Sequence, residues 1–275
     1  MKVYKKKSDI IIQNGEQLYH LVNQDWDKFI NDDGLYKKLQ ANIIGAPTIK
    51  IAKLRGVDAP IDGQELWASG VTYFISKKGR EEESKESGGS FFYSKVYDAP
   101  RPELFFKASK NRISGLGEAV RIRKDSSWNV PEPEWTLFIT SNAKIVGYTI
   151  GNDMSSRDIE GQNPLYLPQA KTYDGCASLG PCIYVPQNPL EGPFEIHLSI
   201  ERAGIIVFQE SISTDQMKRK PQELVDYLFR ECSFPKGAFL MTGTGIVPPL
   251  DFTLDVGDII SIEIEKIGIL TNPVN

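Results

Sequence analysis

Two stretches toward the carboxyl-terminal end alternate strictly between apolar and polar residues, and this alternation limits the fold more than any other feature. FEIHLSIE covers residues 194–201 and ISIEIE covers residues 260–265. A period of two is typical of antiparallel strands with one face buried and one face in water. Gly and Pro separate such runs, and no strand–helix–strand rhythm is present. The chain is therefore predicted to be α+β and rich in β-structure, with a curved sheet or a sandwich.

Helical spacing is found in two regions. Residues 15–40 are predicted to hold one or two helices that include His20, on the spacing of Leu18, Leu21, Val22, Trp26, Phe29 and Ile30. A further helix is predicted to begin at Pro221, with an apolar stripe of Leu224, Val225, Leu228 and Phe229. Residues 1–60 contain no motif that can be linked to chemistry. They are predicted to form a small N-terminal domain before a catalytic domain over residues 61–275.

Composition narrows the class of protein. The chain has 275 residues, of which 40% are hydrophobic and 25% charged, as in ordinary globular proteins. A net charge of -4 argues against a nucleic-acid or anionic-membrane partner, and no apolar run is long enough to span a membrane. The three cysteines show no CxxC spacing, which favours a reducing compartment. A cytoplasmic protein is expected.

A charged and then Gly/Ser-rich run, KKGREEESKESGGS, occupies residues 77–90. It fits a solvated helix end followed by a loop. It also fits a mobile lid beside a site, because long polar loops in compact domains are often functional. The sequence leaves both interpretations open.

Histidine is scarce, and this constrains the chemistry. The chain contains only His20 and His197, and His197 falls on the polar face of the alternating 194–201 stretch. A Ser-His-Asp hydrolase and a histidine-rich zinc site are both poorly supported. A metal ion in this protein is therefore expected to have oxygen ligands.

The stretch PEPEWTLFI places two glutamates at the start of a predicted strand. Glu132 and Glu134 are two residues apart, so both side chains point to one face. A bare pair of this kind is usually only two solvated glutamates. Here, however, Asp153 ends the next apolar run, IVGYTIGND, and the SNAK turn between the runs predicts a hairpin. Three carboxylates at one end of a hairpin suit Mg²⁺, with Mn²⁺ or Ca²⁺ as alternatives.

A lysine follows this predicted site in the stretch LPQAKTYDG. Taken alone, Lys171 would be read as a surface residue. Beside a metal ion, a lysine can bind a substrate carboxylate or act as an acid or base. The turn MTGTGIV lacks the GK[ST] of a phosphate-binding loop, so its glycines alone indicate a turn.

In chain order, GEAVRIR, PEPEWT, GYTIGNDMSSRD, LPQAKTYDGCASLGP, MTGTGIVPP and DVGDIISIEIEKIGILTNPV resemble the fumarylacetoacetate hydrolase family over roughly residues 66–275. The resemblance implies a mixed β-sandwich roll. It implies metal ligands at Glu132, Glu134 and Asp153, and a functional lysine at Lys171. It also implies a substrate-side threonine at Thr244.

One departure from the family pattern points to a particular branch. Hydrolytic members carry an N-Y-x-x-H stretch whose histidine helps to activate water, and Ser76 stands at that histidine position here. The stretches LWASGVTY, VYDAPRPELFFKASKNR, VPEPE and NPLYLPQAK look like the branch that dehydrates 2-keto-3-deoxy-D-arabinonate to 2,5-dioxopentanoate. The resemblance therefore implies a Mg²⁺-dependent dehydratase of a 2-keto-3-deoxy sugar acid, acting through a metal-stabilised enolate.

The resemblance and the chemistry of such a dehydration together assign expected roles. Lys171 and Glu118 are expected to transfer protons. Substrate contacts are expected from Ser69, Tyr73, Lys107 and Thr244, and Tyr73 is a further proton-transfer candidate. Arg157 is expected to orient the carboxylates without touching substrate, and the family implies a homo-oligomer. Three alternatives remain: hydrolysis of a β-diketo acid, decarboxylation or tautomerisation of a related keto acid, and keto-acid binding without catalysis.

Overall fold

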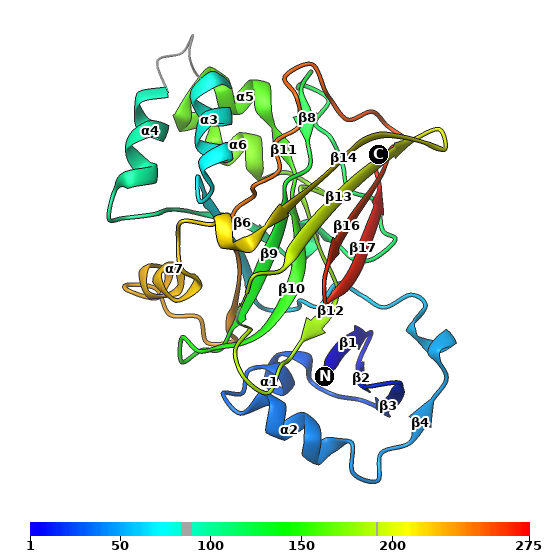
Figure 1. Cartoon of the computed structure of the whole chain (residues 1–275). Helices are drawn as coiled ribbons and strands as arrows, with labels where there is room; N and C mark the ends of the chain where they lie inside the picture. The colour runs from blue at the N-terminus through cyan, green and yellow to red at the C-terminus, as the bar shows by residue number, and fades with distance from the viewer. Residues whose placement is uncertain (84–89, 191) are drawn as a thin grey trace.

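The computed structural model describes residues 1–83, 90–190 and 192–275. Within these residues, a large mixed sheet forms the body of the molecule and a smaller four-stranded sheet packs across it (Figure 1). The prediction of a β-rich α+β fold is confirmed.

The large sheet has eleven strands in the described part of the chain. Its order is β4 (Thr48–Ile49), β3 (Gln17–Leu21), β2 (Asp9–Asn14), β1 (Lys2–Lys6), β12 (Ala177–Tyr184), β10 (Ile145–Asp153), β9 (Pro133–Ile139), β15 (Ala238–Met241), β5 (Glu65–Gly70) and β6 (Glu103–Ser109), with β7 (Ile113–Ser114) beside β12. Because β1 pairs with β12, the N-terminal strands extend the same sheet. A domain boundary near residue 60 stays a prediction.

The smaller sheet contains both alternating stretches. Its order is β14 (Ile205–Ser213), β13 (Glu195–Arg202), β16 (Ile259–Ile264) and β17 (Gly268–Pro273). The apolar residues of β13 and β16 are buried, and they form a core with Leu137 and Ile139 of β9 and Ile150 of β10. The predicted strands are therefore confirmed, and exposed His197 lies on the outer face as expected. A pair of short strands, β8 (Asn129–Val130) and β11 (Ser155–Ser156), completes the sheets.

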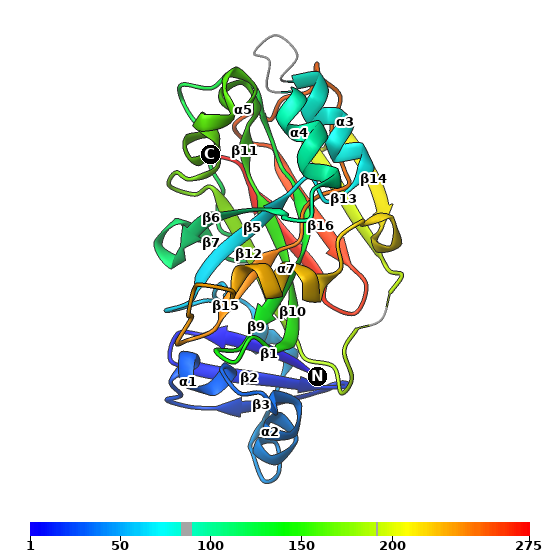
Figure 2. The same cartoon turned by 90° about the vertical axis from the view of Figure 1, so that its left-hand side faces the viewer.

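Most of the α-helices lie at the two ends of the large sheet (Figures 1 and 2). Near the N-terminal strands lie α1 (Trp26–Ile30) and α2 (Leu35–Asn42), and at the opposite end lie α3 (Phe74–Glu83), α4 (Ser90–Asp98), α5 (Arg157–Gln162) and α6 (Leu167–Lys171). The predicted helix at Pro221 is confirmed as α7 (Pro221–Leu228), whose apolar stripe packs into the main core. Short 3-10 turns are η1 (Ile51–Leu54), η2 (Lys110–Arg112), η3 (Pro164–Tyr166) and η4 (Thr214–Gln216).

Part of the helical prediction for residues 15–40 is wrong. Leu18, His20 and Leu21 lie on strand β3, which pairs with β2, whereas helices begin at Trp26 and at Leu35. Strand pairing buries Leu18 against the sheet, so its three-residue spacing from Leu21 does not reflect a helical face.

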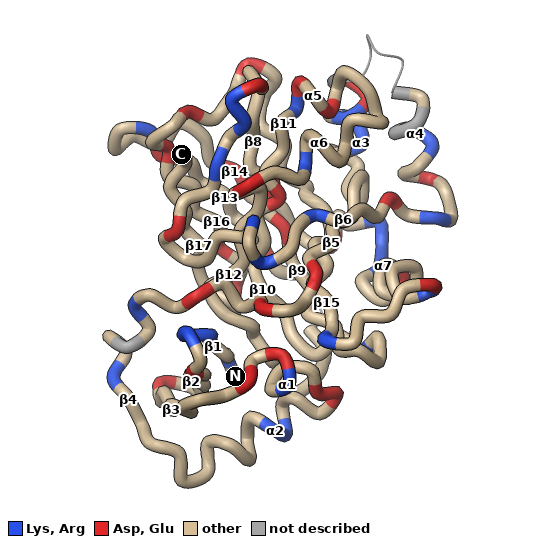
Figure 3. Tube along the Cα trace, turned by 180° about the vertical axis from the view of Figure 1, so that it is seen from behind, with Lys and Arg blue, Asp and Glu red and all other residues tan. Residues whose placement is uncertain are grey.

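The charged run at 77–90 is only partly described. Residues 77–83 belong to α3, and residues 84–89 lie outside the described residues. A lid function for this run stays a prediction. Elsewhere, basic and acidic residues are interspersed along the trace (Figure 3).

Candidate metal centre and active site

The predicted hairpin brings three carboxylates to one end of the large sheet. Strands β9 and β10 are antiparallel, with Glu134 opposite Gly151. This register places Glu132 and Glu134 beside Asp153, because the start of one strand meets the end of the other. The three residues are almost fully buried, and each offers a carboxylate oxygen within 4.8 Å of the others.

Backbone groups hold the two glutamates in position. The amide of Asp153 donates to the carbonyl of Glu132 at 2.9 Å. The amide of Gly243 donates to Oε2 of Glu134 at 2.5 Å. Gly243 has a φ of +93°, and a Cβ there would lie 2.9 Å from the carbonyl oxygen of Ser69. Glycine is therefore required in the MTGTG turn, because the turn must approach both β5 and Glu134 closely.

Two buried lysines form ion pairs with Glu132 and Asp153. Nζ of Lys171 lies 2.6 Å from Oε2 of Glu132 and 3.2 Å from Oδ2 of Asp153. Nζ of Lys107 lies 2.6 Å from Oδ1 of Asp153 and also donates to the carbonyl of Met154 at 2.9 Å. Both side chains are fully buried, so their charges are neutralised within the site.

Two arginines form ion pairs with Glu132. Arg157 lies 2.9 Å from Oε1 of Glu132, in agreement with its expected orienting role, which stays a prediction. Arg80, from α3, lies 3.3 Å from the same oxygen and pairs with the buried carboxylate of Glu160 on α5. Glu160 also accepts a hydrogen bond from Ser155 at 2.7 Å. Arg80 therefore connects α3 to α5 and to a candidate metal ligand.

The electrostatics of the carboxylates suit a bound cation. Burial, followed by the charges of Asp153 and Glu132, raises the pKa of Glu134 well above its usual value. Burial acts in the same direction on Glu132, but the charges of Lys171, Arg157 and Arg80 outweigh it and lower its pKa. A hard divalent ion such as Mg²⁺ would stabilise the ionised form of all three carboxylates. The all-oxygen donor set fits that ion.

One titratable residue near the cluster was not identified from the sequence. Glu103 begins β6 opposite Gly70 of β5 and is half-buried. Burial raises its pKa, which the charges of Arg80 and Lys171 lower and those of Glu132 and Asp153 raise. Glu103 therefore lies in the electrostatic field of the whole cluster. Only the pairing of β5 with β6 brings it there, and no local sequence signal marks it.

The predicted substrate-side residues lie around this centre. Ser69 is buried and donates to the carbonyl of Glu103 at 3.0 Å. Thr244 follows Gly243 and accepts a local hydrogen bond from Ile246 at 3.2 Å. Burial, followed by the charge of Glu134, raises the pKa of Tyr73. The Tyr73 hydroxyl is buried and has no hydrogen-bond partner among the described residues. Substrate contacts for these residues stay predictions.

Ser76, at the histidine position of hydrolytic members, is bonded to its own backbone turn. Its Oγ donates to the carbonyl of Tyr73 at 2.8 Å and accepts from the Tyr73 amide at 3.2 Å. This hydroxyl is thereby engaged at the start of α3.

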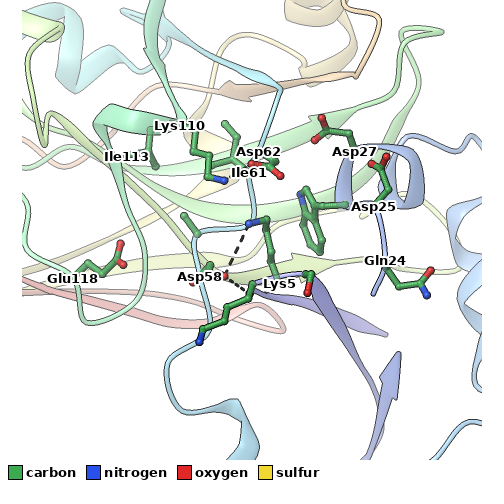
Figure 4. A pocket seen from close by; sticks show the side chains of 14 residues that line it. Lys5, Gln24, Asp25, Asp27, Asp58, Ile61, Asp62, Lys110, Ile113 and Glu118 are labelled. Carbon is green, nitrogen blue, oxygen red and sulfur yellow. Dashed lines mark hydrogen bonds and ion pairs between the residues drawn. The ribbon is translucent and has the colours of Figure 1, made fainter. Parts of the chain in front are cut away.

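Glu118 is not brought into the cluster. It is exposed, and its Oε2 accepts a hydrogen bond from the amide of Gly115 at 2.7 Å. It lines a separate groove together with Lys5, Asp58 and Lys110 (Figure 4). Its predicted catalytic role gains no geometric support from this position.

A family comparison agrees with this geometry. The protein-family sequence model described as "Fumarylacetoacetate (FAA) hydrolase C-terminal" matches residues 76–275 of this chain. The chain belongs to the fumarylacetoacetate hydrolase family.

Particular members of the fumarylacetoacetate hydrolase family are similar over most of the chain. A "probable 2-keto-3-deoxyxylonate dehydratase" of Haloferax volcanii is 48% identical over 222 residues, covering 80% of this chain and 75% of the relative. A 2-dehydro-3-deoxy-D-arabinonate dehydratase of Saccharolobus solfataricus is 44% identical over 248 residues, covering 89% and 79%. A solved 2-keto-3-deoxy-D-arabinonate dehydratase complexed with magnesium and 2,5-dioxopentanoate has a TM-score of 0.85 and 37% identity, covering 100% of this chain and 99% of that one.

Two further expectations can be set beside the structure. In the described residues, no helix is both long enough and apolar enough to cross a membrane. All three cysteines are free, with Cys176 and Cys182 buried and Cys232 exposed.

Proposed function

We propose that this protein is a Mg²⁺-dependent dehydratase that converts 2-keto-3-deoxy-D-arabinonate, or a close 2-keto-3-deoxy sugar acid, to 2,5-dioxopentanoate. The observation that carries the proposal is the buried triad of Glu132, Glu134 and Asp153, which shares its site with Lys171 and Glu103. The proposal is supported by the relatives at 44% and 48% identity, which are named as dehydratases of such acids.

Glu132, Glu134 and Asp153 would hold the cation. When bound, Mg²⁺ withdraws electron density from the keto oxygen and makes the neighbouring C3 protons more acidic. The protein's own residues then have two tasks, which are to remove a C3 proton and to protonate the departing C4 hydroxyl. Later proton shifts give the C5 aldehyde, with a net loss of one water.

Two groups at the site are suited to these tasks. Lys171 lies beside the metal ligands and can take a proton from C3 or hold the substrate carboxylate. Partial burial raises the pKa of Glu103, so a fraction of this carboxyl remains protonated at a higher pH than in an ordinary glutamate and can donate to the leaving hydroxyl. The Oγ of Ser76 is bonded to the Tyr73 backbone, so α3 presents no water-activating histidine to the substrate.

The experiment follows purified protein by NMR with Mg²⁺ and a panel of 2-keto-3-deoxy acids. We expect 2,5-dioxopentanoate from the arabinonate compound, and loss of the reaction after chelation of the metal. Cleavage of a C–C bond, which splits the substrate into two products, would identify a hydrolase instead. Release of CO₂ or keto–enol interconversion alone would identify a decarboxylase or tautomerase, and binding without turnover would identify a silent binder.

The proposal includes a cytoplasmic homo-oligomer that acts in pentose catabolism. The free cysteines support a reducing compartment. Strand β14 lies at the edge of its sheet and exposes Ile205, Ile206 and Val207, which supports a contact between copies. Light scattering should give a mass above that of the monomer, and Ile206→Lys should lower it.

A further inference from the structure

Strand β6 contains a β-bulge at Lys107. Leu66 of β5 pairs with Ala108 of β6, and the next residue of β5, Trp67, pairs with Phe106. Lys107 lies between these two pairs and has no paired residue on β5. A bulge interrupts the usual alternation of side chains. Lys107 and Ala108 are accordingly both fully buried, whereas Phe106 is 37% exposed. The bulge therefore directs the lysine side chain inward.

Protein groups surround the ammonium of Lys107. Its Nζ donates to the carbonyl of Met154 at 2.9 Å and to the carbonyl of Lys171. It also lies 2.6 Å from Oδ1 of Asp153. An ammonium has three N–H donors, so two of them serve carbonyls while its charge faces a carboxylate. Because the side chain is 0% exposed, a substrate could bind it only by displacing one of these partners. These contacts favour a role other than the substrate contact predicted from the sequence.

The bulge is also joined to the end of α6. Lys171 is the last residue of α6, and carbonyls in the last turn of a helix have no intrahelical donor. Lys107 supplies a donor to the carbonyl of Lys171. In the opposite direction, Oγ1 of Thr172 donates to the carbonyl of Lys107 at 3.1 Å. Two hydrogen bonds therefore fasten residues 171 and 172 to β6.

This attachment fixes the candidate base against a candidate metal ligand. Nζ of Lys171 lies 2.6 Å from Oε2 of Glu132 and 3.2 Å from Oδ2 of Asp153. Lys107 contacts the backbone of Lys171 and the carboxylate of Asp153 at the same time. Helix α6 has only five residues, too few to hold its own end in place. The direction of the Lys171 side chain therefore depends on Lys107.

We propose that Lys107 is a positioning residue, which sets Lys171 against Asp153 and does not bind substrate. The bulge in β6 is the feature that allows it to do so. The kinetic part of this inference rests on the proposed dehydratase function. The attachment of α6 to β6 does not, and it is measured separately.

Lys107→Met is the main variant, because it keeps an unbranched side chain and removes the N–H donors. Lys110→Met is the matched control, since it makes the same change at a lysine that is 51% exposed and pairs with Asp62. Hydrogen–deuterium exchange reports the attachment of α6. Exchange in residues 167–173 should quicken about tenfold or more in Lys107→Met and stay at the wild-type rate in Lys110→Met. Continued protection of β13 shows that the variant is folded.

Pyruvate binding and turnover separate positioning from substrate contact. Pyruvate is a 2-keto acid without a C4 hydroxyl, so its dissociation constant at saturating Mg²⁺ measures affinity without elimination. We expect Lys107→Met to bind pyruvate within about twofold of the wild type and to lower turnover about 10–100-fold, the usual effect of removing a group that orients another. Lys110→Met should match the wild type in both measurements.

A double variant tests whether Lys107 acts through Lys171. If the ammonium only directs Lys171, its removal should matter little once Lys171 is replaced. The combination of Lys107→Met with Lys171→Met should therefore turn over at the rate of Lys171→Met alone. Losses that multiply would show that Lys107 acts independently of Lys171 and would overturn the proposal.

Thr172→Val keeps the proposal testable if Lys107→Met does not fold. It removes the second hydrogen bond of the attachment at a half-buried side chain and leaves the ammonium in place. Exchange in residues 167–173 and turnover should change in the same directions as in Lys107→Met, by smaller factors. The pyruvate dissociation constant should not change.

Two further results would overturn the proposal. One is a pyruvate dissociation constant raised about tenfold or more in Lys107→Met with turnover near the wild-type rate at saturating substrate, which would identify a substrate contact. The other is wild-type exchange of residues 167–173 in both Lys107→Met and Thr172→Val. If the wild type itself shows no dehydration, the proposed function fails. Faster exchange with unchanged pyruvate affinity would then still support the positioning of Lys171 by Lys107.

Discussion

In the proposed mechanism, Glu103 and Lys171 are opposite kinds of proton-transfer group, and their charges interact within one cluster. Lys171 contacts two of the candidate metal ligands directly. Glu103 lies at the start of β6, and its partial burial favours the neutral form. An elimination needs one group to accept a proton and another to donate one, and this pair offers both.

Glu103→Gln should lower turnover by about 10²–10⁴-fold, the usual contribution of a general acid or base. The matched variant is Glu118→Gln, which makes the same chemical change at an exposed glutamate bonded to Gly115. It should reduce turnover far less. The measurement is the steady-state turnover of both variants at saturating Mg²⁺. A larger loss of turnover in Glu118→Gln than in Glu103→Gln would indicate that Glu118 is the proton-transfer group.

Lys171→Met separates two roles of the lysine. Exchange of the C3 protons of a 2-keto acid into D₂O needs a base but no leaving group, so it isolates the first step. We expect the wild type to catalyse this exchange and the variant to lose it, with Mg²⁺ affinity measured alongside. Exchange at the wild-type rate, with weaker substrate binding only, would mean that Lys171 is a clamp on the substrate carboxylate.

The candidate metal ligands could be predicted from the sequence because they lie on adjacent strands of one hairpin. Glu132, Glu134 and Asp153 need only the alternation of a strand and one turn to come together. Glu103 and Arg80 reach the same centre through β5–β6 pairing and through α3, which no local pattern reports. Glu118 was predicted from its motif, but its turn places it in a separate recess lined by Lys5, Asp58 and Lys110.

Among the elements, α3 contacts a candidate metal ligand and α5 through the ion pairs of Arg80. Arg80→Gln leaves Glu160 buried without its ion pair, and such changes typically cost about 3–5 kcal/mol. Because α3 is a peripheral helix, we expect local opening. Amide exchange in residues 74–83 should quicken about tenfold or more, while β13 remains protected.

Two controls accompany this prediction. Glu160→Gln should have the same effect as Arg80→Gln, and the double variant should add little to either. Lys77→Gln removes a looser pair on the same helix, 3.8 Å from Glu81, and should change exchange only slightly. Equal acceleration across the whole molecule would contradict a local attachment.

Strand β13 ends at Arg202, whose guanidinium holds Asp258 just before β16. Burial raises the pKa of Asp258, but the hydrogen bonds from Arg202 and from the Asp255 amide outweigh it and lower that pKa. A lowered folded-state pKa stabilises the fold above the unfolded value, near pH 4, and this contribution is lost as pH falls through the folded value.

Asp258→Asn should therefore reduce the free energy of unfolding at pH 7 by about 1–2 kcal/mol, because Arg202 is partly exposed. The difference from wild type should shrink only below about pH 4. Urea unfolding at several pH values measures it. Asp255→Asn removes an exposed partner of the same arginine and should have little effect. A pH-independent difference would contradict the ion pair.

Strict alternation of apolar and polar residues predicts a strand where one of its faces meets water. Strands β13 and β16 show their alternation plainly because the outer face is polar. Strand β12 is buried on both faces along most of its length, so ASLGPCIY shows no alternation and was not identified. Strand β3 was mistaken for a helix because its apolar residues fall three apart by chance.

For the molecule as a whole, burial makes the three cysteines differ in their accessibility to reagents. Burial raises the pKa of Cys182 to about 12, so almost none of it is thiolate at pH 8, and Cys176 is also buried. Iodoacetamide should label only Cys232 in the native protein and all three after denaturation. Intact-mass spectra report the number of adducts. Two adducts on native protein would mean that the large sheet opens readily.

The central place of β1 in the large sheet has a consequence for synthesis. Val3 pairs with Ile183, so the strand that leaves the ribosome early waits for a partner made much later. The early strands β1 to β3 can pair among themselves, but the free edge of β1 stays open until β12 emerges. In a cell that overproduces this chain, nascent polypeptides on one polysome would therefore expose that edge to one another. Yield of the native protein should depend on translation speed and on chaperones that shield the first fifteen residues.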